Sequence, residues 1–295
     1  MQQQQPVAKH AMGSSLAKVS LDEVEAGATH AFACTVGSTF DVRQGPSYEK
    51  TGKKAKSEEN MCEVVGVDVF KSNRKLTHIM EHVIPPEDLT KPLTSTTDFV
   101  YVPQLFVVNF MLPSYNPSNP LWGASVSDGR SYSIVIYIKI LPEAVEAIKN
   151  DSYPAATLLK NFFQMDTKSN EDYLLRGRLK AIPVLLNPDS VNLGMALKSM
   201  VRSYDAKPFL TGPKYHSFIK TDLYLECDVD IHDYVYPARK TLFSLLPEVP
   251  SMLIDFGLLI EGQGDEMPER MLASIRLSRI DPAKAIDIEL PPITK

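Results

Sequence analysis

The chain has 295 residues, of which 44% are hydrophobic and 23% are charged, and its formal net charge is -5. That composition is ordinary for one large globular domain or two small ones, and the acidic balance argues against a dedicated nucleic-acid-binding protein, which usually carries a basic face. The three cysteines, Cys34, Cys62 and Cys227, form no CxxC pair, which argues against a disulfide scaffold or a zinc knuckle and suits a reducing compartment.

The N-terminal residues 1–35 are predicted to form a mobile arm, because the segment starts with a run of glutamines and residues 1–30 lack aromatic side chains. The segment has no apolar core of the kind that secretory signals carry. Elsewhere, no apolar run approaches the roughly 18 residues needed to span a bilayer. We therefore expect a soluble, cytoplasmic protein that is peripheral wherever it meets a membrane.

A basic loop follows at residues 40–57, with turns marked by Gly45-Pro46 and Gly52. It carries five basic side chains against two acidic ones, Asp41 and Glu49; the basic ones are Arg43, Lys50, Lys53, Lys54 and Lys56. Such loops are usually only solvated. The alternative is that this loop binds anionic lipid headgroups or phosphate by surface attraction.

Three strands are predicted over 63–70, 106–112 and 133–140, and the last two are apolar on both faces, as in a covered sheet. The link 113–131 between them is long and rich in Pro, Ser, Asn and Gly, which is typical of lids and binding loops. It contains the only tryptophan, Trp122. That side chain could cover a pocket or touch a membrane or a protein partner. The favoured interpretation is that it folds back onto the domain.

The helices come next, and they complete an α+β pattern. A short helix from Pro142 is followed by an amphipathic helix over 154–163, and a further helix is expected from Asp233 and Pro237 up to Pro247. Strands are predicted at 178–186, 223–231, 251–260 and 271–280, whereas 195–204 is either helical or extended. We expect a largely antiparallel, twisted sheet packed against two or more helices in a single domain over 36–281. The tail 282–295 should be extended.

The strand 223–231 has the most regular pattern in the chain, since Leu223, Leu225, Cys227, Val229 and Ile231 alternate with Tyr224, Glu226, Asp228 and Asp230. The three carboxylates on one face need cationic partners. They could hold Ca²⁺ or Mg²⁺, but a flat strand face suits such ions poorly. The favoured reading is a central strand whose charge ladder fixes register by pairing with Arg178, Lys180, Arg276 or Arg279. Asp255, alone in an apolar strand, also needs a donor.

The segment from His78 to His82 matches H-x-x-E-H, the inverted zinc-protease pattern, with Glu81 as the base. That chemistry needs both histidines on one face of a helix, and Pro85-Pro86 leave little room for one. We therefore favour ordinary loop histidines and expect no metal and no cofactor.

Seven segments, taken in order, resemble the enhanced disease resistance 2 C-terminal domain, a family known from plants and protists. They are FDVRQGPSYEKTGKKA (40–55), VGVDVF (65–70), FVVNFMLP (106–113), RLKAIP (178–183), AKPFLTGPKY (206–215), YLECDVDI (224–231) and LIDFGLLIEGQGDEMPERML (253–272). Gln44 is an insertion in the first segment, and His232-Asp233-Tyr234 replace small residues after the sixth. The resemblance implies a link to lipid and membrane biology, and no member has an established reaction.

These observations favour a non-catalytic, lipid-binding or membrane-associating cytoplasmic domain. In this reading Arg43, Lys50, Lys53 and Lys54 contact headgroups, Trp122 lies in a lid, and a helix-grip-like arrangement encloses an apolar cavity lined by Cys227 and Val229. One alternative is a protein-interaction module without a ligand, which uses the 113–131 loop. The other, ranked last, is a metal-dependent hydrolase that uses the acidic strand, Asp255 or the histidines.

Overall fold

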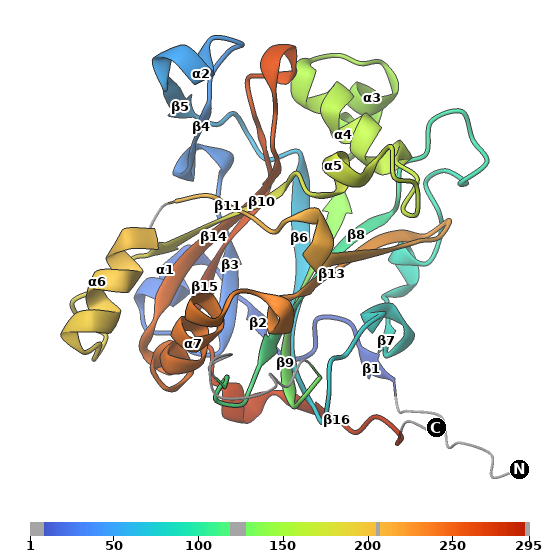
Figure 1. Cartoon of the computed structure of the whole chain (residues 1–295). Coiled ribbons are helices and arrows are strands. Elements are labelled where there is room, and N and C mark those ends of the chain that lie inside the picture. Colours follow the sequence, from blue (N-terminus) through green and yellow to red (C-terminus); the bar gives the residue numbers. More distant parts are fainter. Residues whose placement is uncertain (1–8, 119–127, 205–206, 293–295) are drawn as a thin grey trace, which may run out of the picture.

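The computed structural model describes residues 9–118, 128–204 and 207–292, and they form the expected α+β fold. The strands belong mainly to two six-stranded sheets instead of one (Figure 1). The first sheet has the order β11-β10-β14-β15-β3-β2. Its strands are β2 (Ala17–Lys18), β3 (Ala31–Cys34), β10 (Leu179–Leu185), β11 (Phe209–Leu210), β14 (Leu253–Ile260) and β15 (Met271–Ser278).

The second sheet has the order β12-β13-β8-β9-β6-β16. Its strands are β6 (Cys62–Ser72), β8 (Leu105–Pro113), β9 (Ser131–Ile140), β12 (His216–Lys220), β13 (Tyr224–Asp230) and β16 (Ile286–Ile288). The acidic strand β13 lies next to the edge strand β12 and pairs in parallel with β8, so the expected central position is wrong. As predicted, β8 and β9 are largely covered on both faces.

Two small strand pairs complete the sheets. β1 (His10–Ala11) pairs in parallel with β7 (Val83–Ile84), and β4 (Asp41–Arg43) pairs with β5 (Lys54–Lys56) in an antiparallel hairpin. The hairpin contains the helix α2 (Tyr48–Thr51) between its strands. In Figure 1 it lies at the same end of the molecule as the loop that joins β14 to β15.

The other helices of the described residues are α1 (Leu21–Glu25), α3 (Pro142–Lys149), α4 (Pro154–Gln164), α5 (Tyr173–Arg176), α6 (Met195–Tyr204) and α7 (Tyr236–Leu245). The segment 195–204, left open by the sequence, is therefore helical. α7 ends before Pro247, as expected, but its apolar stripe is only half-buried, and the buried side chain is Arg239. None of the helices in the described ranges is long and apolar enough to cross a bilayer.

One main core joins the two sheets and the helices α3 and α4. The predicted apolar stripe of α4 is confirmed, with Phe162 and Phe163 both fully buried. Both rings pack edge-on against Phe106 of β8, with centroid distances of 5.9 and 6.2 Å. Such edge-to-face contacts add to the free energy gained by burial. Cys227 and Val229 are buried in this same cluster, among packed side chains.

The N-terminal segment belongs to the fold from residue 9 onward, so the expected mobile arm is wrong for residues 9–35. β3 pairs with β15, and Phe32 on this strand is buried in the main core. Just upstream, Gly13 crosses β6 so closely that a Cβ at Gly66 would lie 3.0 Å from the Gly13 Cα. A Cβ on either glycine would push the two backbones apart by a few tenths of an ångström, and Gly13 also has a φ of +71°, which favours glycine.

A buried carboxylate holds this crossing in place. Asp68 is fully buried in β6 and accepts hydrogen bonds from the backbone N–H of Gly13 (2.8 Å) and of Ser15 (2.7 Å). The tail is also fixed in part, because β16 pairs in parallel with β6 and buries Ile288. The expected extended tail therefore contributes an edge strand to the second sheet.

Replacing Asp68 by asparagine should loosen the N-terminal segment. Asparagine has one acceptor oxygen in place of two, so one buried backbone N–H loses its partner at a cost of about 1–3 kcal/mol. We expect amide hydrogen exchange over residues 12–18 to rise by about tenfold or more. The exposed Asp287→Asn variant, which alters only the surface pair with Lys71, is the control. Unchanged exchange in the Asp68 variant would show that the carboxylate does not hold the segment.

Candidate functional site

The acidic strand has an apolar and an acidic face, as its alternation predicts, but both faces are buried instead of one, and the carboxylates contact an unexpected partner. Glu226 and Asp228 are buried, with exposed fractions of 0% and 1%. The backbone N–H groups of Ile79 and Met80 donate to Glu226 (2.6 and 3.2 Å), and that of His78 donates to Asp228 (2.9 Å). The two sequence motifs therefore meet, and the acidic face holds the loop that carries the histidines.

The two buried carboxyls also interact with each other. Burial, together with the charge of Asp228, raises the pKa of Glu226 well above its usual range, and a hydrogen bond joins the two side chains. Burial also raises the pKa of Asp228, although the His78 N–H and the Asn109 amide (2.7 Å to Oδ1) partly oppose that rise. We infer that the pair retains a proton at neutral pH, since two buried like charges so close cannot both ionise freely.

The expected charge ladder with Arg178, Lys180 and Arg276 is wrong, because those side chains belong to the first sheet or its loops and pair there. Arg178 pairs with Glu266 (2.6 Å), Lys180 with Glu269 (2.6 Å) and Arg276 with Asp255 (2.7 Å). Arg279 donates instead to backbone carbonyls near α1. Among the described residues, Asp230 alone of the three acids forms a salt bridge, with Lys75 at 2.7 Å.

The H-x-x-E-H segment contains a short 3₁₀ helix, Ile79–Glu81, in place of the longer helix that zinc proteases use. His78 begins it with a left-handed backbone (φ 54°), and its Nε2 lies 2.7 Å from the Tyr224 hydroxyl. Within the described residues, no three His, Cys, Asp or Glu side chains are grouped so that they could hold a metal ion. This part of the molecule is a structural contact between a loop and a strand.

The basic loop forms a distinct feature, the basic hairpin, which we define as residues 41–56 (β4, α2 and β5). Arg43 docks it onto the loop between β14 and β15. The Arg43 backbone exchanges hydrogen bonds with Glu269, whose N–H donates to the Arg43 carbonyl (3.0 Å) and whose Oε2 accepts from the Arg43 N–H (3.1 Å). The Arg43 guanidinium also pairs with Glu261 at 3.2 Å.

Lys180 of β10 completes a buried ion network under the basic hairpin. Its side chain is 2% exposed, and its Nζ lies 2.6 Å from Glu269 and 3.3 Å from Glu261. Glu269 is equally buried and accepts a further hydrogen bond from the Gly262 N–H (3.2 Å). Buried charges of this kind are stable only when they are paired and hydrogen-bonded.

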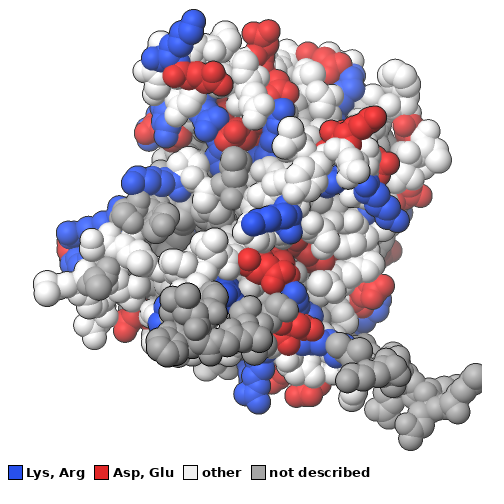
Figure 2. Space-filling model, viewed as in Figure 1, with Lys and Arg blue, Asp and Glu red and all other residues white. Residues whose placement is uncertain are grey.

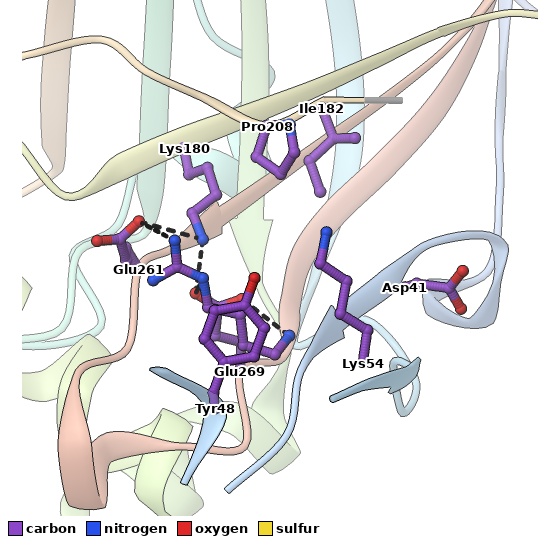
Figure 3. A pocket seen from close by; sticks show the side chains of 9 residues that line it. Asp41, Tyr48, Lys54, Lys180, Ile182, Pro208, Glu261 and Glu269 are labelled. Carbon is purple, nitrogen blue, oxygen red and sulfur yellow. Dashed lines mark hydrogen bonds and ion pairs between the residues drawn. The ribbon is translucent and has the colours of Figure 1, made fainter. Parts of the chain in front are cut away.

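This network forms the floor of an open pocket of about 280 Å³. Six charged residues line it, three basic and three acidic: Arg43, Lys54, Lys180, Asp41, Glu261 and Glu269. The remaining lining residues are Tyr48, Ile182 and Pro208. In the view of Figure 3, the Lys54 amine points toward Ile182 and Pro208, and the Tyr48 hydroxyl lies between this amine and Lys180.

The pocket charges are nearly balanced within the protein itself. Arg43 and Lys180 pair with Glu261 and Glu269, and Asp41 pairs with the exposed Lys56 at 3.3 Å. Among the described residues, Lys54 has no carboxylate partner. Figure 2 shows both signs of charge interspersed over the region of the basic hairpin.

The predicted headgroup residues therefore divide into two groups. Arg43 and Lys54 line the pocket, whereas Lys50 and Lys53 are exposed on the basic hairpin outside it. Trp122 lies outside the described residues, as do all of residues 119–127 in the link 113–131 where it was predicted to act. The pocket residues Tyr48, Glu261 and Glu269 were not predicted, although all three lie in segments that carry the family resemblance.

Comparison with known proteins supports that resemblance. The family model described as "Protein ENHANCED DISEASE RESISTANCE 2, C-terminal" matches residues 32–281. A curated protein of Arabidopsis thaliana, "Protein ENHANCED DISEASE RESISTANCE 2-like", is 23% identical over 254 residues, which cover 85% of this chain and 28% of the relative. The match thus spans little more than a quarter of that relative's length. No solved structure matches the chain.

Proposed function

Because this chain belongs to the enhanced disease resistance 2 C-terminal domain family, we propose that it is a non-catalytic domain that associates with anionic membrane surfaces through the basic hairpin. The observation that carries the proposal is the set of unpaired lysines on this hairpin. Of its basic residues, Arg43 and Lys56 pair with carboxylates. Lys50, Lys53 and Lys54 are exposed and have no carboxylate partner within the described part of the chain.

The size of the expected attraction follows from these three charges. A lysine close to an anionic leaflet contributes about 1 kcal/mol, so three contribute roughly 3 kcal/mol. The docking of Arg43 onto Glu261 and Glu269 holds the hairpin in a fixed orientation, so binding need not order a flexible loop. Membrane association of this strength is reversible, and it weakens as salt screens the lysines.

We propose further that the domain acts in the cytoplasm. Cys34, Cys62 and Cys227 are free thiols, and burial raises the pKa of the Cys62 thiol to about 12. Such thiols are inert and suit a reducing compartment.

The proposal is tested by vesicle flotation of the purified full chain. Wild-type protein should float with phosphatidylcholine vesicles that contain phosphatidylserine, and much less with phosphatidylcholine alone. The double variant Lys50→Glu/Lys53→Glu should lose most of this binding, because two attractive charges become repulsive. Lys149→Glu/Lys168→Glu changes the net charge equally at two exposed sites outside the hairpin, and it is the matched control.

Two outcomes would contradict the proposal. Wild-type protein that floats with neither kind of vesicle would rule out membrane association under these conditions. An equal loss of binding in the control variant would show that net charge, and not the basic hairpin, determines the association.

A further inference from the structure

The pocket beneath the basic hairpin contains groups that membrane attraction alone does not use. Lys54 enters it as a cation without a carboxylate partner, while Tyr48 presents a hydroxyl on the same side (Figure 3). A lysine ammonium and a phenol hydroxyl are both hydrogen-bond donors. Together they suit the oxygens of a phosphate group at the mouth of the pocket.

The floor of the pocket favours a different chemistry. Glu261 lines the pocket, and its ion pairs with Arg43 and Lys180 use the same oxygen, Oε2. A carboxylate offers about four acceptor positions, so Glu261 can still accept hydrogen bonds from hydroxyl groups. A bare phosphate ion offers few hydrogen-bond donors to this floor. A ligand with hydroxyls beside its phosphate offers donors to Glu261 and acceptors to Lys54 and Tyr48.

Size and wall chemistry agree with this combination. A volume of about 280 Å³ is near the lower end of ligand pockets, and it suits a small molecule. Ile182 and Pro208 add apolar wall, which can contact the C–H surface of a polyol. Because Arg43 and Lys180 already neutralise Glu261 and Glu269, the uncompensated charge is that of Lys54.

We propose that this pocket binds a small polyol phosphate. Lys54 and Tyr48 hold the phosphate, and Glu261 accepts hydrogen bonds from the hydroxyls. The inference deepens the proposed function, and it rests on that function only where the polyol phosphate is a lipid headgroup. A free polyol phosphate has the same chemistry, so the test must separate the two sources.

The first arm of the test uses soluble probes and the full chain. In calorimetric titrations, sn-glycerol 3-phosphate and glucose 6-phosphate should bind more tightly than inorganic phosphate, glycerol or glucose. Lys54→Met should weaken binding by about tenfold or more, since a charge-assisted hydrogen bond contributes about 1.5–3 kcal/mol. Tyr48→Phe, which removes a single hydroxyl, should weaken it less. The control Lys149→Glu/Lys168→Glu should retain wild-type affinity, because these exposed lysines lie outside the basic hairpin and do not line the pocket.

The second arm uses vesicles. Phosphatidylserine and phosphatidylglycerol give vesicles of equal charge, but only the second carries a polyol headgroup. Preference for phosphatidylglycerol that is lost in Lys54→Met and Tyr48→Phe identifies the ligand as a lipid headgroup. Binding of the soluble probes without such a preference identifies it as a free polyol phosphate.

The inference is overturned if the soluble probes bind no better than inorganic phosphate and the two kinds of vesicle bind equally. In that case, flotation that still depends on Lys50 and Lys53 would leave the proposed function standing. Conversely, probe binding that depends on Lys54, without any flotation, would support the pocket and reject membrane association.

Discussion

Replacing Lys180 by methionine is expected to destabilise the protein by about 3–5 kcal/mol, because the change takes the closest cation away from the buried Glu269 carboxylate. Glu269 is as buried as Lys180 and lies 2.6 Å from its amine, and Glu261 lies 3.3 Å away. Methionine fills much of the same volume, so the loss comes from charge and not from a cavity. Urea unfolding should show a lower midpoint with an unchanged slope.

The double variant Lys180→Met/Glu269→Gln should recover part of this loss, since it removes the isolated charge as well. The matched control is Lys71→Met, which breaks the exposed pair with Asp287 and should cost no more than about 1 kcal/mol. If Lys180→Met and Lys71→Met lowered the free energy of unfolding by the same small amount, the network under the basic hairpin would not contribute to stability. The same variants also report on the pocket, because its floor is built from these side chains.

The second large effect is a dependence of stability on pH that originates in Glu226. Its pKa in the folded protein is raised by burial and by Asp228, so the folded state binds more protons than the unfolded state. The contribution of Glu226 is therefore fully present below its ordinary pKa, near pH 4, and is lost as pH rises toward the raised value. Within this window the free energy of unfolding should fall by up to about 1.4 kcal/mol per pH unit.

Glu226→Gln should remove this dependence, because glutamine cannot ionise. At low pH the variant is expected to be less stable than wild type, because the protonated carboxyl of Glu226 fits its hydrogen-bond partners better than an amide does. As pH rises, the difference in the free energy of unfolding between wild type and the variant should shrink. Urea unfolding of both proteins between pH 5 and pH 8 measures the difference. Glu63→Gln, which alters an exposed pair with Lys18, is the control, and its free energy of unfolding should change with pH as that of wild type does. If the free energies of unfolding of Glu226→Gln and wild type changed with pH in the same way, Glu226 would be ionised in the folded protein.

Local pattern was sufficient for most of the individual elements. The buried stripe of α4 follows from apolar residues at helical spacing, and the two faces of β13 follow from strict alternation. The apolar runs of β8 and β9 correctly indicated covered strands. These features depend on residues a few positions apart, for which the period of the backbone dictates which side chains share a face.

The N-terminal segment shows where such reasoning fails. β1 and β2 are two residues each, too short to show a period. β1 pairs with the distant strand β7, and β2 pairs with β3, which itself pairs with the distant strand β15. Two signals were nevertheless present. Gly66 inside a strand indicates a close backbone approach, and Asp68 in an otherwise apolar stretch requires buried donors.

Sequence patterns predicted the α+β class, the principal strands and helices, the family, and a basic loop that contains Arg43 and Lys54. The division into two sheets and the partners of the buried charges depend on long-range packing, which no local pattern predicts. Glu226 contacts Ile79 across 147 positions, and Arg43 contacts Glu269 across 226. An acidic residue in a strand shows that some donor must neutralise or solvate it, but several segments can supply one. Only the packing of the whole chain selects backbone amides for Glu226 and Lys180 for Glu269. It thereby forms a closed contact at Glu226 and an open pocket beside Glu269.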